Sequence, residues 1–187
     1  MDCQTETPSL RIEDGDRLIR ALTGDDFPLL LRWLTDERVL EFYAGRDVHY
    51  TPKLLVEHYR EPLPDGIRLI LEYRHVPIGY GQVYRVQGEI NKEYDYPDTG
   101  RIVYAMDQFI GEPEYWNRGI GTAFLRIVAA WLKNEKKAER LLLDPRQKNP
   151  RAVRAYEKAG FRIIKTLSAH ERFEGKDEDC WLMEKEL

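Results

Sequence analysis

The sequence predicts one domain of the α/β (α+β) class, in which helices flank a sheet. Its 187 residues are enough for a single domain with a sizeable core. Short apolar runs typical of strands alternate with segments of helical periodicity, and two well-formed helical segments come late in the chain. No repeat, low-complexity tract or linker divides it. We therefore expect a disordered tail over residues 1–9 and one domain over residues 10–187.

The first half of the chain is predicted to mix short strands with short helices. Thr23 and Thr51 each precede a helical pattern, and Pro28 and Pro52 are tolerated in the first turns that follow. Pro77 must stand at a strand start, because proline cannot donate to a ladder. In chain order, we expect a strand within residues 17–22, helices over about 23–34, 36–43 and 51–59, a hairpin of strands 68–73 and 78–86 that turns around residues 75–77, and a polar stretch over 87–100.

The second half is predicted to alternate strands with the two longest helices. Leu141, Leu142 and Leu143 form a short apolar run that is typical of a buried central strand. In chain order, we expect a strand over residues 101–110, a glycine loop with a helix to about 133, a strand over 140–144, a helix that begins after Asn149, and strands over 161–167 and 180–186.

Composition limits the classes of function. A hydrophobic content of 42% and a charged content of 33% are typical of a soluble globular protein, and no apolar run is long enough to span a bilayer. The N-terminus lacks the pattern of a signal peptide, so we expect a cytoplasmic protein without a membrane partner. Cys3 and Cys180 predict neither a disulfide nor a metal site. A net charge of −4 argues against binding of nucleic acid and is compatible with a cationic substrate.

A glycine loop precedes the first long helix of the second half. The residues Trp116, Asn117, Arg118, Gly119, Ile120, Gly121 and Thr122 form this loop. Two glycines at this spacing let the backbone curl tightly. The first N–H groups of the helix are then free, and they carry the positive end of the helix dipole. Such a loop is either an ordinary tight turn or a cradle for a pyrophosphate.

A second segment, about thirty residues further on, forms a helix with clear ends. Asn149 is a good N-cap and Pro150 suits the first helical position. Ala152, Val153 and Tyr156 share one face, and Gly160 ends the helix where a left-handed conformation is needed. Alone, this segment is only a well-formed helix that leads into a strand.

Together, the two segments resemble the acetyl-CoA-binding half of the GNAT superfamily of N-acetyltransferases. The resemblance implies a mixed, largely antiparallel sheet that splays apart at the acetyl-CoA site. It also implies a reaction that needs no metal. The family loop usually begins with Gln or Arg where this chain has Trp116, so one phosphate contact is lost and the backbone amides remain. The implied acetyl-CoA contacts are Gln108, Phe109, Ile110, Trp116, Asn117, Arg118, Gly119, Ile120, Gly121, Thr122, Asn149, Ala152 and Tyr156.

Further blocks resemble a narrower family, the aminoglycoside 6′-N-acetyltransferases, and most of all the acetyltransferase half of the bifunctional acetyltransferase–phosphotransferase enzymes. These blocks are residues 26–34, 39–47, 76–84 and 106–111. The resemblance implies acetyl transfer from acetyl-CoA to the 6′-amine of an aminoglycoside, and hence antibiotic resistance. It also implies acceptor contacts from Tyr43, Asp47, Gln82 and Tyr84; core packing and a solvated loop are the alternatives for Tyr43 and Asp47.

Asp107 is the first candidate for a catalytic base. An amine must lose a proton before or during attack on a thioester, and a carboxylate can accept it. Asp107 interrupts the apolar run 102–106, where a charge is costly unless it is paired or functional. A structural partner for this carboxylate is the alternative. The resemblance places the family's catalytic base here and gives the backbone of Gln108, Phe109 and Ile110 to the acetyl and pantetheine groups.

Other polar residues carry two interpretations each. Tyr156 is either an acid for the departing thiolate or a core aromatic, and Asp144 either binds a drug ammonium group or makes an Asx turn. The acidic residues 171, 174, 177, 178 and 179 attract a polycation or are simply solvated. The four histidines have no metal-ligand spacing, and we assign none of them a role.

Alternative functions remain open at this point. A fold does not determine the acceptor, so the runner-up is a GNAT enzyme that acts on a polyamine, a hydroxamate precursor or a protein N-terminus. A third possibility is a non-catalytic module that binds acetyl-CoA or drug. The sequence is compatible with a monomer or a homodimer.

Overall fold

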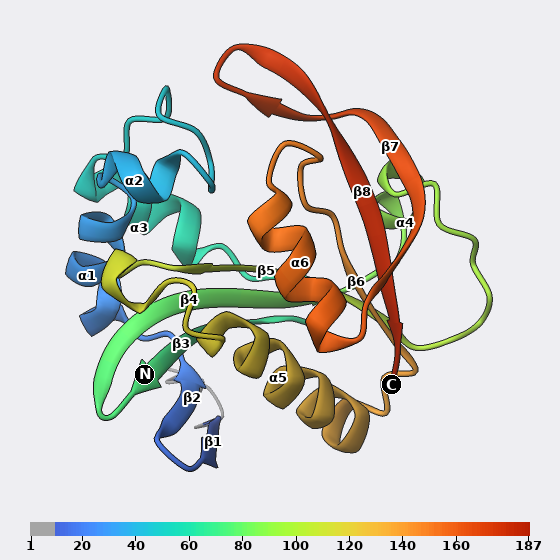
Figure 1. The fold of residues 1–187 in the computed structure, drawn as a ribbon, viewed down its shortest axis with the longest axis horizontal. Coiled ribbons are helices and arrows are strands. Elements are labelled where there is room, and N and C mark those ends of the chain that lie inside the picture. The colour runs from blue at the N-terminus through green and yellow to red at the C-terminus, as the bar shows by residue number, and fades with distance from the viewer. Residues whose placement is uncertain (1–9) are drawn as a thin grey trace, which may run out of the picture.

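One mixed sheet organises the chain (Figure 1). The computed structural model describes residues 10–187, so the tail expected over 1–9 lies outside the described residues. The strands are β1 (Arg11–Asp14), β2 (Arg17–Ala21), β3 (Ile67–Tyr73), β4 (Val76–Arg85), β5 (Val103–Ile110), β6 (Arg140–Leu143), β7 (Arg162–Phe173) and β8 (Lys176–Glu186). They form an eight-stranded sheet in the order β1-β2-β3-β4-β5-β6-β8-β7. Only β5 and β6 pair in parallel, which confirms the mixed, largely antiparallel sheet.

The parallel pair comes apart soon after it forms. Val103–Ala105 of β5 pair with Arg140–Leu142 of β6, and the ladder ends there. Beyond this point β5 continues to Ile110, paired only with β4 on its other side, while β6 ends at Leu143. The expected opening in the sheet therefore lies between residues 106–110 of β5 and the chain that follows β6.

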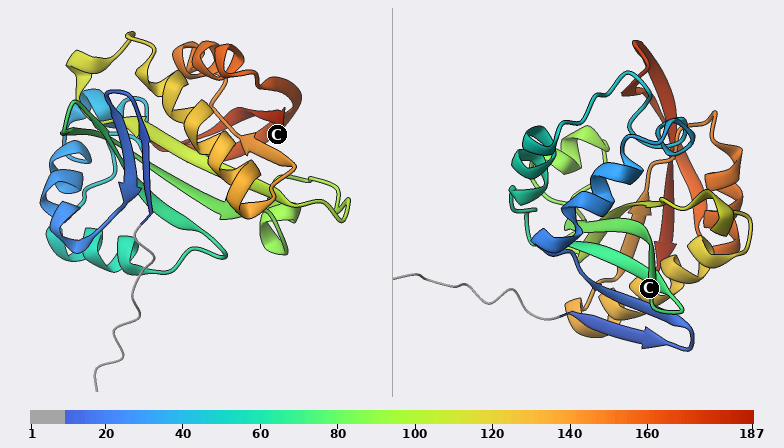
Figure 2. Two further views of the ribbon diagram at one scale, coloured as in Figure 1. Left: turned by 90° about the horizontal axis from the view of Figure 1, so that it is seen from below. Right: turned by 90° about the vertical axis from the view of Figure 1, so that its left-hand side faces the viewer.

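Helices cover both faces of the sheet. They are α1 (Phe27–Trp33), α2 (Glu37–Leu40), α3 (Pro52–Arg60), α4 (Glu89–Glu93), α5 (Ile120–Lys136) and α6 (Pro150–Ala159), with short 3-10 turns η1 (Gly24–Asp26) and η2 (Pro113–Tyr115). The right-hand view of Figure 2 shows α1–α3 and α5–α6 on opposite sides of the central strands. None of the helices within residues 10–187 is both long enough and apolar enough to cross a bilayer.

The alternation of side chains along the strands divides the core between these two layers. On β3, Leu69 and Leu71 pack in the cluster under α5, whereas Ile70 packs with α1 and α3. On β5, Tyr104 and Met106 belong to the α5 side, and Ala105 and Phe109 face the α1–α4 side. The same alternation puts the side chain of Asp107 on the α1–α4 side and that of Gln108 on the α5–α6 side.

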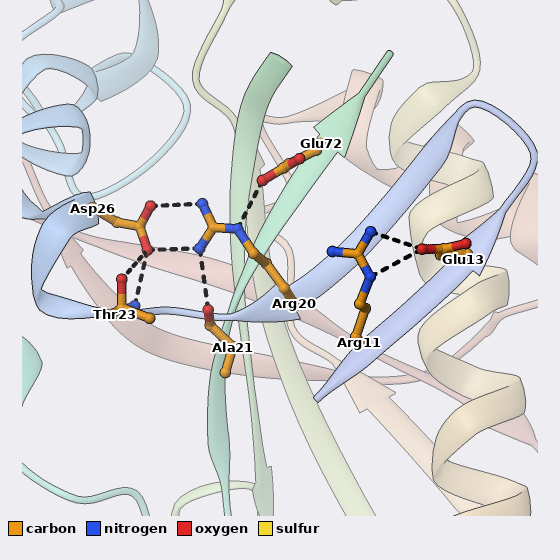
Figure 3. A network of polar contacts seen from close by, with 7 residues as sticks. All are labelled: Arg11, Glu13, Arg20, Ala21, Thr23, Asp26 and Glu72. Carbon is orange, nitrogen blue, oxygen red and sulfur yellow. Dashed lines mark hydrogen bonds and ion pairs between the residues drawn. The ribbon is translucent and has the colours of Figure 1, made fainter. Parts of the chain in front are cut away.

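A network of polar contacts attaches α1 to the sheet (Figure 3). Arg20 of β2 donates two hydrogen bonds of 2.7 Å to the carboxylate of Asp26 and one of 2.7 Å to Glu72 of β3. Asp26 also accepts hydrogen bonds from the backbone N–H and the hydroxyl of Thr23, and these contacts belong to a capping box at the start of η1, which leads into α1. Because Asp26 is buried and doubly paired, the position of α1 against β2 and β3 is well determined.

The structure corrects several sequence-based boundaries. Strand β1 and helix α4 were not expected, and the helix predicted over 36–43 is only α2. Residues 168–179, predicted to lie between two strands, instead extend β7 and β8 into one long hairpin. Its two-residue turn consists of Glu174 and Gly175, both at positive φ, and such turns suit the twist of a hairpin. The β3–β4 turn likewise falls at Arg74 and His75 rather than at 75–77.

Candidate functional site

A cavity of about 650 Å³ occupies the opening between β5 and β6. It is lined by the ends of these strands, by the starts of α5 and α6, and by the segment that follows α2. Most residues selected from the sequence line it, namely Tyr43, Asp107, Gln108, Phe109, Ile110, Trp116, Asn117, Gly119, Ile120, Gly121, Thr122, Asp144, Asn149, Ala152 and Tyr156. Asp47, Gln82, Tyr84 and Arg118 do not line it. Two distant motifs are thus brought to one place by the fold.

The glycine loop presents the free N-terminus of α5 to this cavity. Gly119 has a φ of +74°, which L-residues rarely adopt, and a Cβ added there would meet no atom within 4 Å. Helix α5 begins at Ile120, and no side chain caps its first N–H groups. A helix N-terminus in this state is suited to an anion.

Trp116 and Arg118 have structural contacts that the sequence did not reveal. The indole Nε1 of Trp116 donates a 2.8 Å hydrogen bond to the carbonyl of Ile110, which attaches the loop to the end of β5. The guanidinium of Arg118 lies over the rings of Tyr73 and Tyr115, 5.9 Å and 5.3 Å from their centres. Arg118 is therefore directed away from the cavity that the other loop residues line.

Helix α6 lies beside α5 and adds positive charge to this end of the cavity. Asn149 caps it by accepting a 3.1 Å hydrogen bond from the N–H of Ala152, as the sequence predicts. The hydroxyl of Thr122 donates to the carbonyl of Ala155 at 3.2 Å, which joins the two helices. Arg154 and Lys158 also line the cavity and are exposed. Sequence reasoning missed them, although two basic residues four apart share a helix face.

Asp107 also lines the cavity, and among residues 10–187 no arginine or lysine lies within ion-pair distance of its carboxylate. The amide of Gln82 donates a 2.6 Å hydrogen bond to its Oδ2, and Gln82 in turn accepts one of 2.8 Å from the hydroxyl of Tyr80. Burial and, after it, the nearby charge of Asp144 raise the pKa of Asp107 to about 7, against the opposing effect of the Gln82 hydrogen bond. A base with this pKa accepts a proton efficiently near neutral pH.

Asp144 follows β6 and lies in the same cavity. Its Oδ2 is 2.9 Å from Nε2 of His170, a residue to which the sequence gave no role. Glu171 lines the cavity as well, and burial raises the pKa of its carboxyl group. The other residues of the acidic patch are engaged elsewhere: Glu174 with Arg46, Asp177 with Arg172, Glu178 with Lys148, and Asp179 with the N–H of Ala169.

Tyr156 has the core packing that one interpretation expects, and its role as an acid stays a prediction. It is 9% exposed and packs in the core cluster beneath α5, yet it also lines the cavity. Burial, with the charges of Asp107 and Asp144, raises the pKa of its hydroxyl group, and Gln108 beside it partly lowers that pKa. Its hydroxyl group therefore keeps its proton at neutral pH and is available as a proton donor.

Comparison with known proteins identifies the family. Residues 23–169 match the family model described as "Acetyltransferase (GNAT) domain", so the chain belongs to the GNAT acetyltransferases. A curated relative, the aminoglycoside N(6′)-acetyltransferase type 1 of Klebsiella pneumoniae, is 28% identical over 149 residues, which cover 76% of this chain and 72% of the relative. A protein of the same name from Serratia marcescens matches with the same identity and coverage.

Solved structures agree with this assignment. AAC(6′)-Ib in complex with ribostamycin and coenzyme A superposes with a TM-score of 0.76 at 26% identity, covering 91% of this chain and 93% of that chain. AAC(6′)-Ib in complex with coenzyme A and kanamycin superposes with a TM-score of 0.73 at 26% identity, covering 90% and 93%. The single GNAT fold predicted from the two motifs is confirmed.

Proposed function

We propose that this chain transfers the acetyl group of acetyl-CoA to the 6′-amino group of aminoglycosides and thereby confers resistance to them. It acts in the cytoplasm, as a monomer or a homodimer. The observation that carries this proposal is the presence of both basic and acidic groups in the cavity between β5 and β6. The N-terminus of α5, Arg154 and Lys158 line the cavity, and so do the carboxyl groups of Asp107, Asp144 and Glu171. Arg146 lines it as well and is paired with Glu171. This distribution matches a polyanionic donor and a polycationic acceptor, and the relatives named above bind that pair.

The donor end fits acetyl-CoA. Gly119 leaves open space above the first turn of α5, where the pyrophosphate would be held. The side-chain oxygen of Gln108 is buried without a hydrogen-bond partner at the point where β5 leaves β6, as is expected of a group that contacts a ligand. When bound, acetyl-CoA supplies an acetyl group that is activated as a thioester. The backbone of Gln108, Phe109 and Ile110, free of β6, would hold the acetyl and pantetheine groups.

The acceptor end fits a protonated amine that must lose its charge. The ammonium group first loses one proton to solvent, which frees the lone pair on its nitrogen. As that nitrogen bonds to the acetyl carbon, Asp107 accepts its second proton, and Gln82 holds the carboxylate in place. The carbon–sulfur bond breaks, and the sulfur leaves with the electron pair. Tyr156 is the donor that lies on the α5–α6 side to protonate it. Backbone N–H groups of residues 108–110 stabilise the negative charge that develops on the acetyl oxygen.

The acceptor is tested by release of the CoA thiol with paired acceptors. We expect rapid release with kanamycin and little release with an analogue that carries a hydroxyl group at the 6′ position. Product mapping should place the acetyl group on the 6′ nitrogen. Faster turnover with spermidine or a peptide N-terminus than with kanamycin would favour another amine acceptor. Binding of drug without thiol release would contradict catalysis.

A further inference from the structure

A distortion in β7 directs His170 toward the acceptor end of the cavity. Leu167 pairs with Cys180 and Glu171 pairs with Glu178, so three residues of β7 stand opposite the single residue Asp179 of β8. Within this bulge Ala169 has a φ of +51°, and its N–H donates 2.9 Å to the carboxylate of Asp179. Bulges re-aim side chains, and strained residues persist where the surroundings hold them.

The imidazole of His170 contacts the segment that follows β6. Its Nε2 lies 2.9 Å from Oδ2 of Asp144, and because a carboxylate only accepts hydrogen bonds, Nε2 is the donor. The side chain of His170 is 8% exposed, and its ring lies 5.6 Å from that of Tyr94. Tyr94 in turn shares a 3.0 Å hydrogen bond with Tyr84 of β4. His170 is therefore enclosed on the wall of the cavity that holds the two aspartates.

We propose that His170 is a positioning residue of the acceptor site, which holds the Asp144 carboxylate through Nε2 and balances its negative charge, so that Asp107 and the incoming ammonium group experience a reduced field. This proposal rests on the proposed function, and it adds a residue to which neither the sequence motifs nor the relatives' names assign a role.

The charges around His170 determine the sign of its effect. Asp144 after β6, Glu93 of α4 and Glu171 of β7 are all acidic, and they raise the pKa of the imidazole despite its burial. Arg146 lies 3.6 Å from Glu171 and compensates that carboxylate instead. An imidazolium here opposes the effect of Asp144, whose charge raises the pKa of Asp107. Without the imidazolium, Asp107 should bind its proton more tightly.

Two substitutions separate the charge of His170 from its packing. His170→Gln keeps a hydrogen-bond donor and removes the charge. We expect it to move the acidic limb of the kcat/KM profile for kanamycin upward by at least about half a pH unit. Asp144→Asn should move the same limb downward, and the double variant should behave as Asp144→Asn does, because His170 acts through Asp144. His75→Gln, in the exposed β3–β4 turn, is the matched control and should leave the limb in place.

A second measurement does not depend on turnover. In the wild-type protein, the ring-proton NMR signal of His170 should titrate above the ordinary histidine pKa of about 6.5, and it should return toward that value in Asp144→Asn. A loss of activity in His170→Gln that is equal at every pH, or an NMR titration that Asp144→Asn leaves unchanged, would overturn the proposal. Absence of turnover with every aminoglycoside would instead contradict the proposed function, and the NMR titration would still decide the role of His170.

Discussion

Asp107 combines three features that are seldom found together in a folded protein. It interrupts an apolar strand, it lacks a cationic partner within residues 10–187, and it shares its cavity with Asp144. Each feature favours the neutral acid, whereas Gln82 and, to a lesser extent, Tyr84 favour the carboxylate. The balance leaves the pKa of Asp107 at about 7, where it can take up and release a proton in each turnover.

Asp107→Asn tests this role directly. The amide has nearly the same shape and cannot accept a proton, so kcat with kanamycin should fall by about 10²–10⁴-fold. The affinity for acetyl-CoA, measured by calorimetry without drug, should change by less than about threefold, because the side chain of Asp107 faces the α1–α4 side and the proposed pyrophosphate site is at the N-terminus of α5. Wild-type kcat/KM should decline as the pH falls through about 7, where Asp107 becomes protonated. Near-normal turnover by the variant would exclude a base at this position.

A residue could be predicted from the sequence when its role depends on its neighbours in the chain. Asp107 was predicted because a charge in an apolar run is visible in the sequence, and Asn149 because caps follow local rules. The indole of Trp116 donates a hydrogen bond to Ile110 because β5 ends at that residue, and His170 reaches Asp144 because of the bulge in β7. These last two depend on register between distant segments, which no local pattern contains.

At the scale of elements, the N-terminus of α5 is the proposed donor site, and its geometry depends on a left-handed residue. Gly119 and Gly175 offer a matched pair, since both have a φ of +74° and neither would bring a Cβ within 4 Å of another atom. Gly119 begins α5, whereas Gly175 lies in the turn between β7 and β8. The two positions differ in place and not in local strain.

Gly119→Ala and Gly175→Ala should therefore lose similar stability, about 1–2 kcal/mol each, from the strain of a left-handed alanine. Only Gly119→Ala should weaken the binding of acetyl-CoA and raise its KM at least about tenfold, because the loop that presents the amides to the pyrophosphate relaxes. Thermal unfolding and steady-state kinetics with varied acetyl-CoA provide the two measurements. An equal rise in KM for both variants would show that general destabilisation, and not the loop, controls donor binding.

The elements that were predicted well are those with local start and stop residues. Helices α5 and α6 were predicted because glycine, asparagine and proline occupy their ends. The extension of β7 and β8 was missed because its strands are polar, and the register and the turn stabilise them rather than an apolar face. The Glu174–Gly175 turn was the one local feature that could have revealed it.

At the scale of the whole molecule, the opening in the sheet connects two layers that otherwise have separate cores. Asp107 projects toward the α1–α4 side and Tyr156 lies in the cluster of the α5–α6 side. The two side chains thus stand on opposite faces of one sheet, and both line the cavity where β5 and β6 part. This arrangement places a titratable carboxyl group inside the fold.

That placement predicts a cost in stability that the reaction requires. The pKa of Asp107 is about 7 in the folded chain, above the value of about 3.9 for an unfolded aspartate. The protonated acid therefore stabilises the fold fully below about pH 4, and this contribution is lost as the pH rises through about 7. At about pH 8, the free energy of unfolding of Asp107→Asn should be higher than that of the wild type by roughly 1–3 kcal/mol. This range is smaller than the full pKa difference implies, because the carboxyl group is partly exposed to the cavity.

Urea unfolding of both proteins at about pH 8 and about pH 4.5 measures this difference, which should shrink to within about 0.5 kcal/mol at the lower pH. Glu135→Gln, an exposed carboxyl on α5 without a hydrogen bond or ion pair among residues 10–187, is the control, and it should change neither value by more than about 0.5 kcal/mol. Equal stability of Asp107→Asn and the wild type at both pH values would mean that the carboxylate is well solvated. The general base would then have an ordinary aspartate pKa, and the decline in activity would begin well below neutral pH.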